Sequence, residues 1–254
     1  MIRAKVNITG TITKEAVVRT DKNHKSYLSF ILTVRLSDPK ISQKEVNIFV
    51  AMYNGKQEDL SILTIGKQVV VSGEMDIHKK EDFSFYLNAE KYEVQQLQSV
   101  DAISGSLIFR GRLKNDNIYE EKNDKNGNPY LIFSAYSSEK HGEEFFSTWV
   151  NFMRFPEKGA SIDTIKPDFM KPKATLSIIG DLTISSYDGN IRISSIVKEI
   201  SEYQKTEQEI EALETDIANL DEELMRPEYA CNAHKLNELS TAREEKETAL
   251  TAAM

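Results

Sequence analysis

Aromatic residues at alternating positions are the residues of this chain whose type and spacing best fit a chemistry. Segments 27–36 and 45–53 each alternate between an apolar set and a second set, and neighbouring side chains of a strand point to opposite faces. Phe30, like Phe133 about a hundred residues later, falls in the apolar set. The rings expected to face outward are Tyr27, Phe49, Tyr53, Phe85, Tyr130, Tyr136, Trp149 and Phe155. Outward rings can stack on the bases of a single-stranded nucleic acid, whatever its sequence.

Two of these assignments depend on more than alternation. Phe83, Phe85 and Tyr86 cannot all lie on one side of a strand, so the face of each stays open, and Phe85 is included in the outward set. Trp149 aligns with Phe49 when the two halves of the chain are compared. This alignment predicts an exposed ring at the same place in both halves.

Basic residues near these rings are candidates for holding phosphates. The expected phosphate contacts are Arg35, Lys56, Lys79, Lys80, Arg112 and Arg154, with Arg110 and Arg192 as further candidates. Most surface lysines only keep a protein soluble, and each of these has that plainer interpretation. Residues 1–100 carry 14 Lys and Arg against 12 Asp and Glu, and residues 101–200 carry 13 against 14. Bulk charge therefore does not by itself argue for binding a polyanion.

No arrangement of residues predicts catalysis, a metal site or a cofactor. The four histidines, at positions 24, 78, 141 and 234, fall in polar segments that look like turns, without metal-ligand spacing. Cys231 is the single cysteine, which excludes an internal disulfide and a multi-thiolate zinc site. We therefore expect a binding protein rather than an enzyme.

The elements that position the rings are short strands that occur twice in the same order. The expected strands of the first half are 6–12, 27–36, 45–53, 68–77 and 83–94, with a short helical segment within 54–65. Those of the second half are 106–113, 130–137, 144–155, 174–184 and 190–200. Five short antiparallel strands with a helical link after the third are typical of an OB-fold barrel. The sequence thus predicts a mainly β chain with tandem OB folds at 1–98 and 99–200.

The last segment, 201–254, has a helical period instead. Its apolar residues Ile210, Leu213, Ile217, Leu220 and Leu224 follow the alternating spacing of a coiled-coil seam. The RPEYACNAHK sequence interrupts the pattern, which resumes at Leu236. The segment carries 5 Lys and Arg against 14 Asp and Glu. We expect an acidic antiparallel coiled-coil hairpin that repels DNA and serves oligomerisation or partner docking.

Both halves resemble the OB fold of bacterial and phage-type single-stranded DNA-binding proteins. The first half shows this in NITGTI, LSFILTV, FVAMYNGK and GKQVVVSGEM. The second shows it in FRGRL, LIFSA, STWVNFMRF and KATLSIIGDL. The resemblance implies binding of single-stranded DNA. It also implies a homodimer, because two-barrel chains of that family pair to supply four barrels.

The C-terminal segment is similar to the coiled-coil hairpin that ends ABC-F ATPases, in EIEALETDIANLDEEL and HKLNELSTAREEKE. The phosphate-binding loop of such an ATPase does not occur in the sequence. No apolar run is long enough to span a bilayer, and MIRAKVNITG lacks a secretory apolar region. A cytoplasmic protein, of a bacterium or a phage-infected host, is expected.

Two hypotheses of function follow. The first is non-sequence-specific single-stranded DNA binding and protection in replication or recombination, with replication or recombination proteins docking on the hairpin. The alternative is a structural or assembly protein whose barrels and coiled coil bind protein, which the near-neutral charge of residues 1–200 favours. A steep fall of affinity with salt distinguishes nucleic-acid binding from protein binding. The sequence does not separate DNA from RNA.

Overall fold

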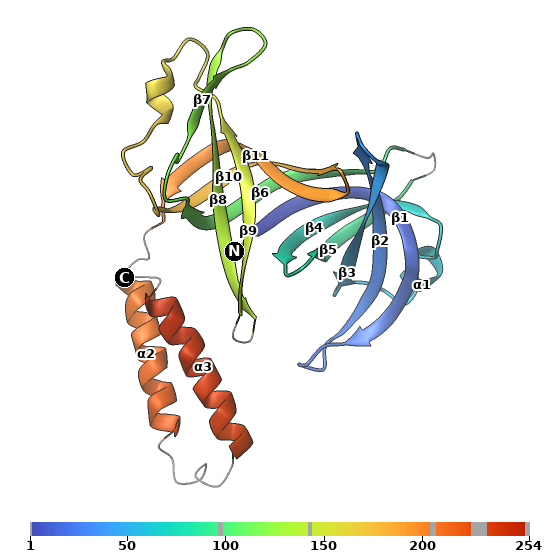
Figure 1. The fold of residues 1–254 in the computed structure, drawn as a ribbon. Helices are drawn as coiled ribbons and strands as arrows, with labels where there is room; N and C mark the ends of the chain where they lie inside the picture. The colour runs from blue at the N-terminus through green and yellow to red at the C-terminus, as the bar shows by residue number, and fades with distance from the viewer. Residues whose placement is uncertain (1, 96–98, 142–143, 204–206, 225–232, 252–254) are drawn as a thin grey trace. The chain divides into compact units, whose positions relative to one another are not determined.

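The computed structural model shows a mainly β chain with one large sheet and two C-terminal helices (Figure 1). It forms two compact units, residues 1–202 with the strands and residues 203–254 with those helices. The structure describes residues 2–95, 99–141, 144–203, 207–224 and 233–251.

Within the described residues, the sheet contains eleven strands. The first five are β1 (Ile2–Thr20), β2 (Ser26–Asp38), β3 (Ser42–Met52), β4 (Gln68–Lys79) and β5 (Phe83–Val94), with helix α1 (Asp59–Ile62) after β3. The others are β6 (Ala102–Leu113), β7 (Glu120–Asn123), β8 (Pro129–His141), β9 (Glu144–Arg154), β10 (Thr175–Tyr187) and β11 (Asn190–Glu202). A single 3₁₀ turn, η1 (Ile162–Ile165), precedes β10.

The first five strands close into a ring, which we call ring 1. β1 pairs with β4 along its first half and with β2 along its second, while β2 pairs with β3 and β4 with β5, all antiparallel. A parallel pairing of β3 with β5 completes the order β1-β2-β3-β5-β4. Gly10 lies where β1 passes from β4 to β2, and a Cβ there would lie 2.7 Å from the carbonyl oxygen of Thr33. Glycine thus permits the close approach at this bend.

The later strands form ring 2 in the matching order β6-β8-β9-β11-β10, again with one parallel pairing, between β9 and β11. Gly111 takes the place of Gly10, and a Cβ there would lie 2.3 Å from the carbonyl oxygen of Tyr136. The additional strand β7 pairs with β8. Alternation does not predict β7, because its four residues, EEKN, are all exposed and none is apolar.

An antiparallel ladder between β1 and β6 joins the two rings into one sheet. It runs from Ile2 opposite Phe109 to Thr9 opposite Ala102. At its centre Lys5 pairs with Ser106, and these two precede Gly10 and Gly111 by the same distance along the chain. Equivalent residues facing each other mean that the rings are related by an approximate twofold axis through this pair.

Strand alternation predicts the core correctly at β2, β3 and β8. The apolar faces of β2 and β3 are buried, and Phe30 and Phe133 are each almost completely buried. In ring 2 the Phe152 ring lies between those of Phe109 and Phe133, with centroids 5.0 and 5.1 Å away. The main difference lies in β1, expected at 6–12 but observed as Ile2–Thr20, because its polar second half pairs with β2.

The helical unit contains α2 (Glu207–Leu224) and α3 (Ala233–Thr251). Lys246 Nζ lies 2.5 Å from Asp216 Oδ2, and Arg243 forms an ion pair with Asp221. The lower-numbered residue of α2 pairs with the higher-numbered residue of α3, so the helices are antiparallel. Pro227 and Cys231 lie outside the described residues. Among the described helices, none is long and apolar enough to cross a membrane.

Candidate nucleic-acid interface

Two pairs of aromatic rings lie on the outer face of ring 1. Tyr27 of β2 and Tyr53, just beyond β3, have ring centroids 5.1 Å apart. Phe49 of β3 stacks on Tyr86 of β5 at 5.4 Å, and the two residues are 43% and 49% exposed. Lys25, which the sequence analysis did not select, places its Nζ 5.1 Å from the centre of the Tyr53 ring. This arrangement combines stacking platforms with a cation next to one of them.

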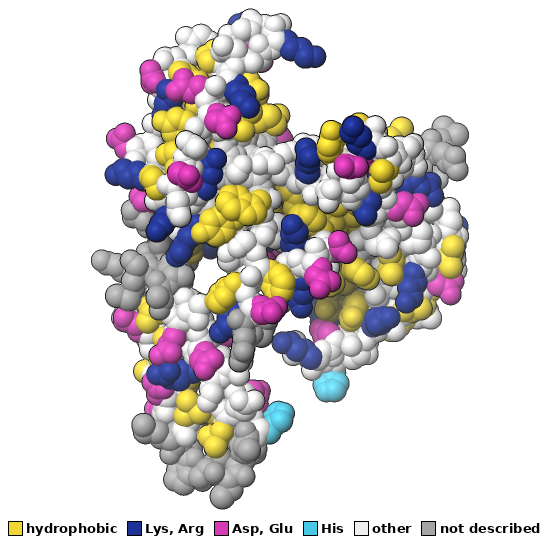
Figure 2. All heavy atoms as spheres, in the orientation of Figure 1, with side chains coloured by type: hydrophobic (Ala, Val, Ile, Leu, Met, Phe, Trp, Pro, Cys, Tyr) yellow, Lys and Arg dark blue, Asp and Glu magenta, His cyan; other side chains and the backbone are white. Residues whose placement is uncertain are grey.

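Ring 2 carries two further pairs, in which β8 residues meet Trp149 of β9 and Phe155 just beyond β9. Tyr130 stacks on Phe155 with centroids 5.0 Å apart, and Tyr136 lies 4.9 Å from Trp149. Trp149 is 48% exposed. Figure 2 shows hydrophobic side chains gathered over the middle of β8 and β9 in this view. Seven of the eight aromatic side chains predicted to face outward therefore lie in four pairs, two pairs on ring 1 and two on ring 2.

Phe85 is the exception, and its prediction is wrong. It is 1% exposed and lies opposite Ile48 and Ile77, inside ring 1. The next residue, Tyr86, faces outward opposite Phe49 instead. Alternation alone does not say which residues of β5 face the core. The parallel pairing of β3 with β5 decides this. Tyr86, which alternation alone does not place on the outer face, is therefore an additional candidate for the binding face.

The predicted equivalence of Trp149 and Phe49 is also wrong. From the matched glycines, Ile12 pairs with Leu32 in ring 1, as Leu113 pairs with Ala135 in ring 2. One step further along, ring 1 has Thr33 opposite Asn47, whereas ring 2 has Tyr136 opposite Trp149. One step back, ring 1 has Ile31 opposite Phe49, whereas ring 2 has Ser134 opposite Asn151. The position that holds a hydrogen-bonded polar pair in ring 1 thus holds an aromatic pair in ring 2. The position that holds Phe49 in ring 1 holds a polar pair in ring 2.

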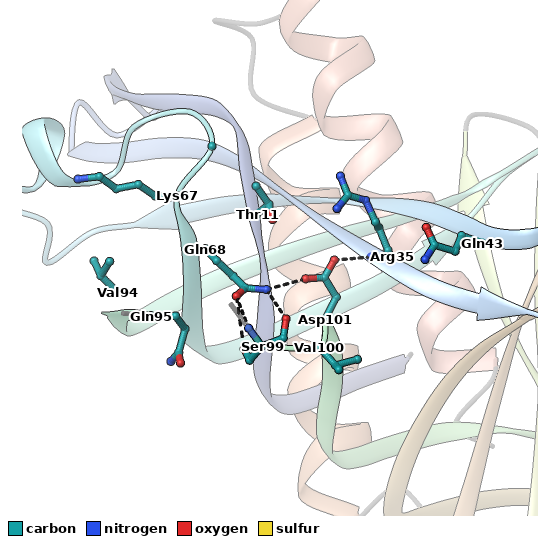
Figure 3. Close-up of a pocket in the computed structure, with 11 residues that line it drawn as sticks. Thr11, Arg35, Gln43, Lys67, Gln68, Val94, Gln95, Ser99, Val100 and Asp101 are labelled. Atoms are coloured by element: carbon teal, nitrogen blue, oxygen red, sulfur yellow. Dashed lines mark hydrogen bonds between the residues drawn. The ribbon is translucent and has the colours of Figure 1, made fainter. Parts of the chain in front are cut away.

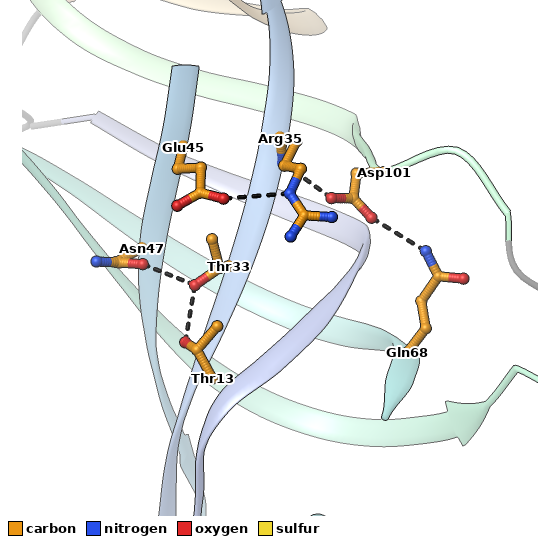
Figure 4. A network of polar contacts seen from close by, with 7 residues as sticks. All are labelled: Thr13, Thr33, Arg35, Glu45, Asn47, Gln68 and Asp101. Atoms are coloured by element: carbon orange, nitrogen blue, oxygen red, sulfur yellow. Dashed lines mark hydrogen bonds and ion pairs between the residues drawn. The ribbon is translucent and has the colours of Figure 1, made fainter. Parts of the chain in front are cut away.

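The polar pairs are held by short hydrogen bonds. In ring 1, Thr33 Oγ1 donates to Asn47 Oδ1 at 2.7 Å and lies 2.8 Å from Thr13 Oγ1 (Figure 4). In ring 2, Ser134 Oγ donates to Asn151 Oδ1 at 2.8 Å. These contacts fix the amide groups of both asparagines on the outer faces.

The predicted basic residues divide into two groups. Lys56, Lys80 and Arg112 are exposed, and Lys79 places its Nζ 5.3 Å from the centre of the Phe83 ring. Arg154 instead donates from Nη1 to the carbonyl oxygen of Ile165 in η1 at 3.1 Å, and burial lowers its pKa. Arg154 therefore supports the segment after β9, in addition to any contact with a ligand.

Arg35 lies in a polar network that also anchors the connection between the rings. Its Nε donates to Glu45 Oε1 at 3.1 Å, and its backbone N–H donates to Asp101 Oδ2 at 2.9 Å (Figure 4). Gln68 Nε2 donates to Asp101 Oδ1 at 3.0 Å and to the carbonyl oxygen of Ser99 at 2.7 Å. Arg35, Gln68, Ser99 and Asp101 line a groove of about 730 Å³ where the chain leaves ring 1 (Figure 3). Because Glu45 partly neutralises Arg35, this arginine offers less charge to a phosphate than its exposure suggests.

A buried carboxylate joins the end of β2 to the β10–β11 turn. Asp38 accepts hydrogen bonds from Ser186 Oγ at 2.5 Å and from the backbone N–H of Gly189 at 2.9 Å. It also accepts from Lys40 and Ile41 in its own turn. Burial acts to raise the pKa of Asp38, but these donors outweigh it and hold the pKa well below its usual range.

A second contact between the rings involves a histidine that the sequence placed in a turn. His78 lies in β4, its Nδ1 is 2.7 Å from Glu139 Oε2 of β8, and its ring meets that of Tyr86 with centroids 5.8 Å apart. The β4–β5 hairpin of ring 1 thus reaches β8, as the β10–β11 turn of ring 2 reaches Asp38. Within the described residues, no group of three or more His, Cys, Asp or Glu side chains is arranged to hold a metal ion.

The chain is similar to several solved structures of single-stranded DNA-binding proteins. The wild-type protein from Thermus aquaticus has 14% identity and a TM-score of 0.39, with 80% of this chain and 94% of that one covered. A small single-stranded DNA-binding protein from Streptomyces coelicolor has 17% identity and a TM-score of 0.31, with 39% and 96% covered. No protein-family model and no curated protein matches the sequence.

Proposed function

We propose that this chain binds single-stranded DNA without sequence specificity, and that its two rings are OB folds spanning 1–98 and 99–200. The four aromatic pairs on the outer faces of ring 1 and ring 2 carry the proposal. Rings on the outer face of a small closed barrel offer π surfaces that every base can use, and each stacked base contributes roughly 1–3 kcal/mol. The strand order repeated in the two rings supports the assignment of both as OB folds.

The binding face in this proposal includes rings from both halves and cations beside them. The stacking residues are Tyr27, Phe49, Tyr53, Tyr86, Tyr130, Tyr136, Trp149 and Phe155. The phosphate contacts are Lys25, Lys56, Lys80 and Arg112, with smaller parts for Lys79, Arg35 and Arg154. Two faces in one chain raise the affinity, because the second binds at the effective concentration set by the first.

A titration of a labelled thymidine oligonucleotide at several salt concentrations tests the proposal. For a single strand, log K falls against log salt with a slope of about −0.7 per phosphate contact, so four contacts give a slope of about −2.8. A duplex of the same length serves as control and should bind much more weakly. An RNA of the same sequence tests whether the sugar matters. Absence of single-strand binding at low salt would contradict the proposal.

Trp149 supplies an internal probe, because it is the single tryptophan of the chain. Its exposed indole pairs with Tyr136 on the proposed face of ring 2. Stacking of a base on this ring should quench its fluorescence during the titration. Binding without quenching would move the contact to ring 1 and leave ring 2 with a packing role.

The helical unit has a separate part in this proposal. It accounts for the whole net negative charge of the chain, which opposes binding to DNA. We propose that α2 and α3, as a coiled-coil hairpin, dock replication or recombination proteins or a second copy of the chain. If the rings bind protein instead of DNA, as their near-neutral charge also permits, the titration shows no salt-sensitive binding of the strand.

A further inference from the structure

A cleft of about 510 Å³ opens where the two rings meet. Three segments form its walls: β3, the β4–β5 hairpin of ring 1, and the β10–β11 turn of ring 2. Its lining includes Phe49, Phe83, Asn47 and Asn190. Its volume falls within the range of about 300–1,000 Å³ that is usual for small-ligand sites. The cleft exists only because both rings contribute to it.

The two asparagines present opposite hydrogen-bonding groups to a ligand. Asn47 Oδ1 accepts from Thr33, so its NH₂ group points away from β2 as a donor (Figure 4). Asn190 Nδ2 donates to the carbonyl oxygen of Asp188 at 3.0 Å, which leaves its Oδ1 as an acceptor. A donor and an acceptor beside an aromatic ring match a nucleobase, which has a flat face and an edge with both kinds of group.

The turn that carries Asn190 is held rigidly. Asp188 and Gly189 have φ angles of 53° and 75°, as a two-residue hairpin turn requires, and the backbone N–H groups of both donate to Asp38. Ser186 donates to the same carboxylate. Asp38 of ring 1 thereby fixes the position of an acceptor from ring 2 opposite β3, before any ligand arrives.

The charges around the cleft suit a neutral base better than a phosphate. Lys44 and Lys79 line it together with Glu45, Glu81 and Asp82, so cations and carboxylates nearly balance. The Lys79 ammonium lies against the Phe83 ring, and Glu45 pairs with Arg35. An anion gains little in such a place, whereas stacking and amide hydrogen bonds do not depend on net charge.

We propose that this cleft is a subsite for one nucleobase of the bound strand, stacked on Phe49 with its edge between Asn47 and Asn190. Asp38 acts as the positioning residue through the turn. The inference rests on the proposed function, since it assigns one base of the single strand to a site shared by both rings.

The test combines a variant of the protein with a variant of the ligand. Thymidine N3–H can donate to Asn190 Oδ1, and N3-methylthymidine cannot. Two oligonucleotides of about 20 nucleotides are used, one made of thymidine and one of N3-methylthymidine. This length reaches both rings, because an OB fold binds roughly 4–16 nucleotides. Their affinities are measured for the wild type, Asn190→Ala, Asn47→Ala and the control Asn7→Ala. Asn7 is a matched control because it is also an exposed strand asparagine whose Oδ1 accepts a hydrogen bond from a hydroxyl, that of Ser72. It does not line the cleft.

Asn190→Ala and Asn47→Ala should each weaken binding of the thymidine strand by about 2- to 10-fold, the value of one uncharged hydrogen bond, and Asn7→Ala should not. Replacing thymidine by N3-methylthymidine should lower the affinity of the wild type about 2- to 10-fold more than it lowers the affinity of Asn190→Ala. The variant already lacks the hydrogen bond that methylation removes. Equal methylation costs in the two proteins, or no loss of affinity in both cleft variants, would overturn the subsite while leaving strand binding intact. Absence of strand binding by the wild type would instead overturn both the subsite and the proposed function.

Discussion

At the scale of single residues, neighbouring side chains on one strand have opposite tasks. Phe85 and Tyr86 are adjacent in β5, yet Phe85 belongs to the core and Tyr86 to the outer face of ring 1. The difference follows from which residue of β3 each one faces, Ile48 or Phe49. Their substitutions should therefore separate stability from binding.

Tyr86→Ala should weaken binding of a thymidine oligonucleotide by roughly 5- to 150-fold, because one stacked base contributes about 1–3 kcal/mol. Its effect on unfolding should be small. Phe85→Ala should instead lower the free energy of unfolding by about 3–5 kcal/mol, since it leaves a cavity in the core. Urea denaturation and the oligonucleotide titration measure both effects. A Tyr86→Ala protein that binds as tightly as the wild type would remove this ring from the proposed face.

At the scale of elements, the two rings are held together by contacts outside the β1–β6 ladder. Asp38 places a carboxylate among donors from its own turn and from the β10–β11 turn. A carboxylate with a lowered pKa stabilises the fold at pH values above its unfolded pKa, near 3.9, and this stabilisation is lost as the pH falls through the lower folded pKa. The contact therefore makes a testable contribution to acid stability.

Asp38→Asn should be less stable than the wild type at pH 7, and the difference should shrink as the pH falls below about 4. The amide keeps the shape of the side chain but loses the charge that the donors stabilise. Chemical denaturation of both proteins from pH 7 to pH 2 measures the difference. Asp181→Asn is a matched control, because Asp181 is exposed and pairs with Lys198 on the surface. A stability difference that does not depend on pH would contradict the role given to the charge.

The β1–β6 ladder has its own test at Gly105. A Cβ at this position would lie 2.0 Å from the backbone oxygen of Lys5, so Gly105→Val should push β6 away from β1. Overpacking of this kind costs about 1–3 kcal/mol, or roughly 2–12 °C in melting temperature for a unit of this size. Ser104→Val places the same side chain at an exposed neighbouring position and should have little effect. An unchanged melting temperature for Gly105→Val would show that the ladder contributes little to stability.

At the scale of the whole molecule, the unit that contains the β-strands and the helical unit differ in net charge. Residues 1–200 are near neutral, whereas residues 201–254 carry the acidic excess. Removal of the helical unit should therefore leave the proposed DNA-binding face intact and relieve a long-range repulsion.

A protein that ends at residue 202 should bind a thymidine oligonucleotide as tightly as the full chain or more tightly, with the larger difference at low salt, where charges are least screened. Titrations at two salt concentrations measure this. Circular dichroism of the shortened protein provides the control for folding. A loss of binding with the strands still folded would mean that the helices take part in holding the strand.

The sequence was sufficient for the order of the strands and for most of the outward rings, because both depend on local alternation. It was not sufficient to predict that Phe85 is buried, that Trp149 aligns with Asn47, or that Arg154 forms a hydrogen bond with η1. Each of these depends on which residues face each other across strands that are distant in sequence. The cleft was missed for a related reason, since its walls come from both rings and no local pattern marks it.

In the proposed function, the exchanged places of the aromatic and polar pairs determine how a strand of DNA would lie on the protein. Two identical faces related by a twofold axis would accept a nucleic acid equally in either orientation. Here Trp149 occupies the place of Asn47, two residues from Phe49, so the two rings are not identical and the two orientations of a bound strand are not equivalent. Binding should thus have a polarity, from 5′ to 3′ along the chain. Successive molecules on a long strand would then all face the same way.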